Sequence, residues 1–160
     1  GRFRAPADYP RQAAAVVATH DLPTLAGLWA GRDHDWRERL GLFPSKEVKA
    51  KMAAERASDR RGLIEAFVEE GQLPPDADPD RVEPEALSLA AHGFLARTQA
   101  RLALVQAEDV LGEAEQANLP GTTDEHPNWR RRLSLSVDAL LSDPRLLRLA
   151  EEMRRQRPRT

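Results

Sequence analysis

Residues 13–19 read Ala13-Ala14-Ala15-Val16-Val17-Ala18-Thr19 and lead directly into His20-Asp21, with Pro23 close behind. Small and β-branched residues without alternation are typical of a strand buried on both faces of a parallel sheet, although the run alone also suits a helix. An ionisable pair at the carboxyl end of such a strand is where α/β barrels place active-site residues. The stretch therefore predicts a buried strand with a functional site at its end.

The same pattern returns in the run Leu102-Ala103-Leu104-Val105-Gln106, which is also followed by acids, Glu108-Asp109. Two such strands with helices between them form a βαβ unit, here enlarged by an insertion. Because two strands do not make an independent parallel sheet, we expect the chain to be part of a larger fold. Neighbouring residues on a strand point to opposite faces, so Glu108 and Asp109 are predicted to cap a helix or fill a buried structural role.

The rest of the chain predicts mainly helices. Ser45 is a candidate N-cap for a long helix ending near Gly71, and Pro84 is placed to open another. Expected helices cover 24–30, 34–40, 46–70, 84–100, 136–141 and 144–156. Their apolar stripes comprise Leu63, Ile64, Phe67, Val68, Leu87, Ala90, Ala91, Phe94 and Leu95. These stripes form the predicted core.

Composition narrows the function class. The 160 residues carry a net charge of −2 with 31% charged residues, which disfavours nucleic-acid and membrane-surface binding. Aromatics make up only 5%, so Ala and Leu supply most of the core, and cysteine is absent, which excludes disulfides and thiolate metal sites. No run approaches the roughly 20 apolar residues of a membrane span, and the polar start, Gly1 to Pro10, does not resemble a signal peptide. The cytoplasm is the compartment expected.

The histidines raise the possibility of a metal site and the arginines that of nucleic-acid binding, but the sequence disfavours both interpretations. His34, His92 and His126 lack metal-ligand spacing, so neither a metal nor a cofactor is expected. The run Arg130-Arg131-Arg132 invites a nucleic-acid interpretation, but no interleaved aromatics accompany it.

Two longer segments carry a family resemblance. One runs Thr19-His20-Asp21-Leu22-Pro23-Thr24-Leu25-Ala26-Gly27-Leu28-Trp29, and the other runs Asn118-Leu119-Pro120-Gly121-Thr122-Thr123-Asp124-Glu125-His126-Pro127-Asn128-Trp129-Arg130-Arg131-Arg132-Leu133. With Val105-Gln106-Ala107-Glu108-Asp109 between them, the chain resembles the C-terminal part of the amylomaltase (disproportionating enzyme) family of 4-α-glucanotransferases. Weaker similarity extends over nearly the whole chain.

This resemblance implies a fold of the α/β class, a (β/α)8 TIM barrel of which the chain is one part, itself mainly α-helical with two short parallel strands. Val16-Val17 would lie in barrel strand seven and Leu104-Val105 in strand eight. The implied organisation is residues 1–22 as loop and strand seven, 23–100 as a helical insert, and 101–160 as strand eight, sugar-site loop and C-terminal helices. The implied activity is retaining transfer of α-1,4-glucan segments between glucans or to glucose.

The resemblance also assigns site residues. Asp21 stands at the position of a third catalytic carboxylate that binds sugar hydroxyls, and His20 at that of its neighbour on the same glucose ring. Asn118 matches a sugar-site asparagine, with Pro120 and Gly121 turning the backbone beside it. The nucleophile and the acid/base, from barrel strands four and five, have no counterparts here. The isolated chain is therefore expected to be inactive, with α-1,4-glucans and the remainder of the same enzyme as its partners.

Alternative readings stay open for each feature. His20-Asp21 also suits a satisfied polar pair ending a strand, and Asn118 a turn residue that caps its own backbone. Trp29 and Trp129 suit either stacking on sugar rings or ordinary packing. A non-catalytic helical interaction module, or nucleic-acid binding through the arginine clusters, would be the function if the resemblance failed.

Overall fold

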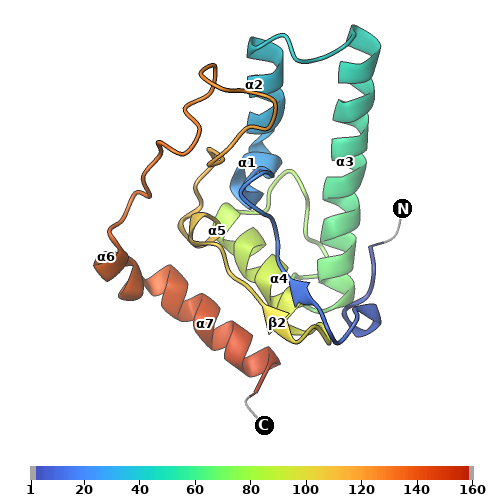
Figure 1. Cartoon of the computed structure of the whole chain (residues 1–160). Helices are drawn as coiled ribbons and strands as arrows, with labels where there is room; N and C mark the ends of the chain where they lie inside the picture. Colours follow the sequence, from blue (N-terminus) through green and yellow to red (C-terminus); the bar gives the residue numbers. More distant parts are fainter. Residues whose placement is uncertain (1–2, 159–160) are drawn as a thin grey trace.

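The computed structural model describes residues 3–158, so Gly1, where the predicted amino-terminal segment starts, lies outside the described residues. In chain order the elements are η1 (Pro6–Asp8), β1 (Ala14–Ala15), α1 (Leu25–Ala30), α2 (Arg32–Arg39), α3 (Lys46–Glu69), α4 (Pro84–Ala96), β2 (Leu102–Ala103), α5 (Ala107–Leu111), α6 (Val137–Leu141) and α7 (Pro144–Gln156). Figure 1 shows α4 in the middle of the molecule, with α3 on one side and α7 on the other.

The two strands are neighbours and run parallel, as predicted. Ala14 pairs with Leu102 and Ala15 with Ala103. Backbone hydrogen bonds extend this pairing by one step at each end, from Arg101 N to Arg11 O (2.8 Å) and from Leu104 N to Ala15 O (2.9 Å). The strands are shorter than the predicted runs, which reached Ala18 and Gln106.

Burial of the strands differs from the expectation. Ala15 is buried and packs against Leu95 and Ala100, but Leu102 is 57% exposed and Leu104 is 50% exposed. Burial on both faces is therefore wrong for the second run in this structure. The physical reason is that the described helices cover one face of the two-stranded sheet, and β2 pairs with β1 alone within residues 3–158.

Helices α3 and α4 begin where local signals predicted. The hydroxyl of Ser45 accepts from Val48 N at the start of α3, and Pro84 occupies the first turn of α4. Both signals depend only on residues within one helical turn, so they can be recognised from the sequence alone. The helix expected over 34–40 begins earlier, at Arg32. The helix α5 was not predicted: Glu108 and Asp109 occupy its first turn instead of the end of a strand, and acids there complement the helix dipole.

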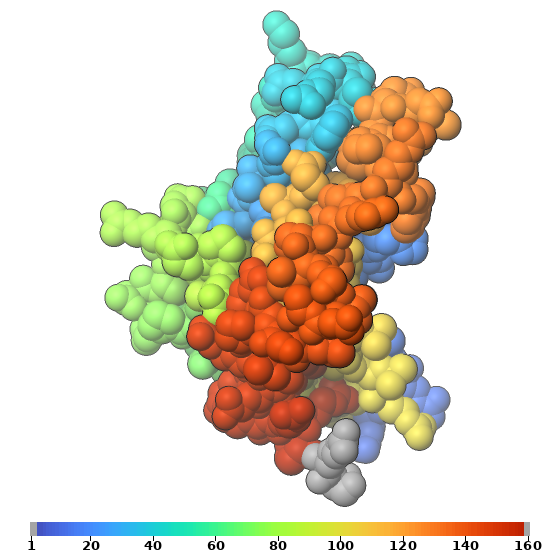
Figure 2. All heavy atoms as spheres, turned by 90° about the vertical axis from the view of Figure 1, so that its left-hand side faces the viewer, coloured from blue at the N-terminus to red at the C-terminus, as the bar shows by residue number. Residues whose placement is uncertain are grey.

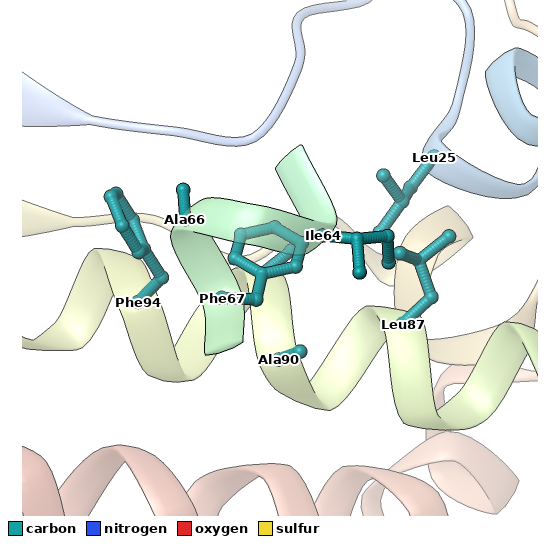
Figure 3. Packing of buried hydrophobic residues seen from close by; sticks show 8 residues of the cluster. Leu25, Ile64, Ala66, Phe67, Leu87, Ala90 and Phe94 are labelled. Carbon is teal, nitrogen blue, oxygen red and sulfur yellow. The ribbon is translucent and has the colours of Figure 1, made fainter. Parts of the chain in front are cut away.

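The core forms where α3 and α4 meet, with α1 at one end. Figure 3 shows Phe67 of α3 between Phe94 and Leu87 of α4, while Ile64 faces Leu25 of α1. The Phe67 and Phe94 rings meet edge to face at 5.7 Å between centroids, a favoured aromatic geometry. The predicted stripes of α3 and α4 are confirmed as the core. Because Leu25 belongs to this cluster, the start of α1 is anchored to it.

The long segment between α5 and α6 lies along one side of the molecule, coloured orange in Figure 2. Glu115 ties this segment to α2, since its carboxylate accepts from the indole of Trp36 (2.8 Å) and from Arg32 (2.7 Å). The ring of His126 also meets the Trp36 ring edge to face, at 4.7 Å between centroids. Each helix within residues 3–158 is too short or too polar to span a lipid bilayer.

Candidate functional site

The loop between β1 and α1 carries the predicted pair. Leu22 N donates to Thr19 O (3.0 Å), so His20 and Asp21 occupy a tight turn and are exposed. Thr24 then caps α1 by accepting from Gly27 N (3.0 Å). The turn places two ionisable side chains outside the core, in the loop that follows β1.

Asn118 reaches Asp21 from a segment far along the chain. Its amide nitrogen donates to Asp21 Oδ1 over 2.6 Å, across a separation of 97 residues. The backbone carbonyl of Asn118 accepts from Gln116 Nε2 (2.5 Å), and Gln116 is itself buried. The Asn118 amide nitrogen is thus engaged by Asp21 instead of its own backbone. The two side chains therefore converge, as the family resemblance implied.

His20 and Trp129 complete the exposed group. His20 Nε2 lies 3.4 Å from Asp21 Oδ2, and these two side chains are 60% and 52% exposed. The His20 ring also lies beside Trp129, with centroids 5.2 Å apart and planes inclined at 50°. Trp129 is 64% exposed and has a φ of +60°, the left-handed region that bulky residues rarely adopt. The indole of Trp129 is thus exposed beside His20 and Asp21, and its backbone is strained.

The loop that carries Asn118 and Trp129 is braced by Asn128. Its side-chain oxygen accepts from Leu119 N (2.9 Å), and its amide nitrogen donates to the Thr122 hydroxyl (2.9 Å). The turn between these points uses Gly121, whose φ of +85° favours glycine, and exposed Pro120 precedes it. Pro120 and Gly121 therefore shape the turn beside Asn118, and their predicted role in substrate binding stays a prediction.

The chemistry offered by this group is hydrogen bonding together with ring stacking. A carboxylate accepts from hydroxyl donors, and aromatic rings offer apolar area with a polar edge. Small-molecule sites typically combine such apolar surface with a few convergent polar groups. Within residues 3–158, no three His, Cys, Asp or Glu side chains gather as a metal ion would need.

The sequence left both sugar stacking and ordinary packing open for Trp29 and Trp129, and the structure gives the two side chains different surroundings. Trp29 donates its indole N–H to Pro79 O (3.0 Å), and the guanidinium of Arg60 covers its ring at 4.8 Å. Trp29 is therefore a packing residue. Trp129 is the one placed beside His20, and its positive φ is a tertiary feature that no local sequence signal announces.

Two further side chains near the site were not predicted to contact it. Gln106 Oε1 accepts from Ala18 N (3.1 Å), and Asp109 Oδ1 accepts from Leu25 N (2.7 Å). The predicted capping or buried role of Asp109 is confirmed, because it caps α1 from within α5 and is 2% exposed. Nothing in the sequence indicated which helix it caps, and Gln106 read simply as the polar end of a strand.

Parallel strands with polar and aromatic side chains gathered beyond their carboxyl ends are the substrate-site arrangement of α/β enzymes. Residues 1–137 match the 4-alpha-glucanotransferase family, and the chain belongs to that family. It is 33% identical to the 4-alpha-glucanotransferase of Haemophilus influenzae over 154 residues, covering 91% of this chain and 21% of the relative. It is 38% identical to that of Mycobacterium tuberculosis over 144 residues, covering 86% of this chain and 19% of the relative.

A solved structure agrees with these sequence matches. The amylomaltase from Corynebacterium glutamicum superposes on 95% of this chain with a TM-score of 0.84 and 30% sequence identity, and the match covers 23% of that protein. The chain thus spans about a fifth of the length of the relatives that it matches.

Proposed function

We propose that this chain is the C-terminal part of a retaining 4-α-glucanotransferase and that it supplies the side chains which hold the sugar at the bond being cleaved. The complete enzyme would transfer α-1,4-glucan segments between glucans or to glucose. The observation that carries the proposal is the contact from Asn118 to Asp21, which joins two loops beyond the carboxyl ends of paired parallel strands in a chain of this family.

The two strands would be strands seven and eight of a (β/α)8 barrel, with residues 23–100 as a helical insert between them. The exposure of Leu102 and Leu104 supports this placement, because a complete barrel would bury these side chains against its interior or its outer helices. The remainder of the same enzyme is then the first partner of this chain, and α-1,4-glucans are the second. Cytoplasmic location and the absence of a cofactor are part of the same proposal.

Asp21 would act as the charge-stabilising carboxylate. A retaining reaction needs a nucleophile and an acid/base about 5–5.5 Å apart, and both would come from barrel strands four and five. Asp21 would accept hydroxyl hydrogen bonds from the sugar ring, and these bonds strengthen as the ring flattens toward an oxocarbenium ion. Asn118 fixes Asp21 Oδ1 through its amide, which presets the direction of the carboxylate before substrate arrives.

His20 would contact the same sugar ring, and Asn118, Pro120 and Gly121 would border it. His20 Nε2 faces the second carboxylate oxygen of Asp21, so the imidazole and Asn118 approach the carboxylate at different oxygens. Such two-sided support reduces the rearrangement that the site would otherwise undergo during reaction.

The experiment is to incubate the complete gene product with maltotriose and to separate the products by chain length. Transfer predicts glucose together with maltooligosaccharides longer than the substrate. Products no longer than maltotriose would show hydrolysis in place of transfer, and no products at all would overturn the proposal. The 160-residue chain alone should release no glucose above a heat-inactivated sample, because it would lack both bond-breaking carboxylates.

A further inference from the structure

The loop that carries Asp21 is held at both ends by side chains from the segment that follows β2. At one end Gln106 Oε1 accepts from Ala18 N over 3.1 Å, and at the other Asp109 Oδ1 accepts from Leu25 N over 2.7 Å. We propose that Gln106 and Asp109 are positioning residues for Asp21. This inference rests on the proposed function, because it names the side chains that hold its central carboxylate in place.

The pairing of the strands ends before the loop begins. The last backbone bond of the ladder runs from Leu104 N to Ala15 O, so residues beyond it have no sheet partner to order them. Ordering the backbone of such a residue costs conformational entropy. Gln106 replaces the missing ladder bond with a side-chain bond at Ala18, which extends the coupling between the strands toward His20 and Asp21.

The far end of the loop is fixed more tightly. Besides the bond from Leu25 to Asp109, the hydroxyl of Thr24 donates to Glu113 O over 2.5 Å. A Cβ placed on Gly27 would lie 2.3 Å from Ala114 O, so α1 approaches this segment as closely as a backbone without a side chain allows. The start of α1 therefore has little freedom to shift along the segment 113–114.

The surroundings of Asp109 reduce the free energy of unfolding. It is 2% exposed, and its second oxygen, Oδ2, has no hydrogen-bond partner among the described residues. His92, fully buried in α4, interacts with it electrostatically and has its own Nε2 without a partner. A buried polar atom without a partner has lost its water without gaining a hydrogen bond, which destabilises the folded state. An apolar residue would avoid that cost, but it could not accept the Leu25 N–H that fixes the loop.

Asp21 itself depends on this support. Its side chain is 52% exposed, and its described contacts are with exposed His20 and with Asn118. Exposed contacts alone tolerate movement, whereas a shift of about 1 Å at a reacting centre costs on the order of 100-fold in rate. The buried bond at Leu25 and the partly buried bond at Ala18 are what limit such a shift.

A positioning role makes a prediction that ordinary capping does not. Ser45 caps α3 with one side-chain bond, just as Asp109 caps α1, but α3 is not the helix that the Asp21 loop enters. Loss of either cap should lower the melting temperature. Only loss of the Asp109 or Gln106 bond should change turnover per folded molecule.

The test uses the complete enzyme with Gln106→Ala, Gln106→Glu, Asp109→Ala, Asp109→Asn and, as the matched control, Ser45→Ala. For each variant kcat and KM on maltotriose are measured per folded molecule, together with amide hydrogen exchange at residues 18–25. Glu and Asn keep an acceptor oxygen at the bonding position, so they serve as rescue variants. Gln106→Ala, at the less buried bond, keeps the test available if Asp109→Ala does not fold.

We expect the two alanine variants to lose about 10- to 100-fold in kcat with little change in KM, and to exchange faster at residues 18–25. The rescue variants should recover most of the turnover, and Ser45→Ala should match the wild type in kcat and in exchange at 18–25. Normal kcat in both alanine variants, or rescue variants as slow as the alanine ones, would overturn the inference. If the wild-type enzyme shows no transfer, the proposed function fails. Unchanged amide hydrogen exchange at residues 18–25 in both alanine variants would show separately that Gln106 and Asp109 do not hold the loop.

Discussion

Asn118 donates its side-chain amide to Asp21 Oδ1 over 2.6 Å, although 97 residues separate them. Asp21 stands in the loop between β1 and α1, and Asn118 in the segment that follows α5, so this bond ties together two segments that lie far apart in the chain. An amide N–H that meets a carboxylate makes a charge-assisted hydrogen bond, which is shorter and stronger than a neutral one. The bond thus orients the carboxylate on which the proposed chemistry depends.

The first prediction concerns the charge of Asp21. In the complete enzyme Asp21→Asn keeps the shape and an acceptor for Asn118, but it removes the negative charge that an oxocarbenium-like transition state favours. We expect kcat to fall about 10²–10³-fold, or roughly 3–4 kcal/mol, with a smaller change in KM. Asp124→Asn, an exposed carboxylate of the neighbouring loop, is the matched control and should keep normal turnover. Near-normal kcat in Asp21→Asn would remove this residue from the catalytic group.

The second prediction concerns the donor. Asn118→Leu has a similar volume but cannot donate to Asp21, so the carboxylate loses one fixed direction. A hydrogen bond to a charged group contributes about 1.5–3 kcal/mol, which corresponds to about a 10- to 100-fold fall in kcat/KM on maltotriose. Circular dichroism and the melting temperature show whether the loop still folds. A lower melting temperature with unchanged kcat/KM would favour a turn role for Asn118.

The parts of this fold that sequence predicted are those set by contacts within a turn or by a repeated pattern. Ser45 and Pro84 mark helix starts because their effects reach only the next three or four residues. The two short apolar runs predicted a parallel pair because their composition suits that environment, and the structure confirms the pairing. The resemblance to a known family brought Asp21 and Asn118 together before any coordinates did.

The features that sequence missed depend on residues far apart in the chain. Gln106 meets Ala18 across 88 residues, and Asp109 meets Leu25 across 84. No local pattern encodes such a partner. The exposure of Leu102 escaped prediction for a related reason, since burial depends on neighbours that an apolar run implies but does not supply. The positive φ of Trp129 is likewise imposed by the braced loop and not by the residue itself.

The third prediction concerns Trp129, whose strained and exposed position suggests a stacking role. Trp129→Gly relieves the backbone strain at φ +60°, worth about 1 kcal/mol, but removes the aromatic surface. We expect an unchanged or higher melting temperature together with about 3- to 10-fold weaker maltooligosaccharide binding by calorimetry, and near-normal binding in Trp129→Phe. Trp29→Phe is the control with the opposite pattern, because it loses a partly buried bond to Pro79 O and should reduce stability alone. Equal affinity in Trp129→Gly and wild type would assign Trp129 to packing.

The last prediction concerns the pH dependence of stability. Burial lowers the pKa of His92 from 6.5, although the Ser88 carbonyl and Asp109 oppose that shift. The native state therefore binds fewer protons than the unfolded state as the pH falls through 6.5, so the contribution of neutral His92 is present above that pH and is lost below it.

His92→Asn keeps an amide donor for the Ser88 carbonyl but does not titrate. We expect the free energy of unfolding to fall more steeply between pH 7.5 and 5.5 in the wild type than in His92→Asn, with a difference of at most about 1.4 kcal/mol per pH unit. Urea unfolding at several pH values measures both slopes, and Ser45→Ala should lower stability while keeping the wild-type slope. Equal slopes in wild type and His92→Asn would mean that His92 is protonated in the native state as readily as in the unfolded chain.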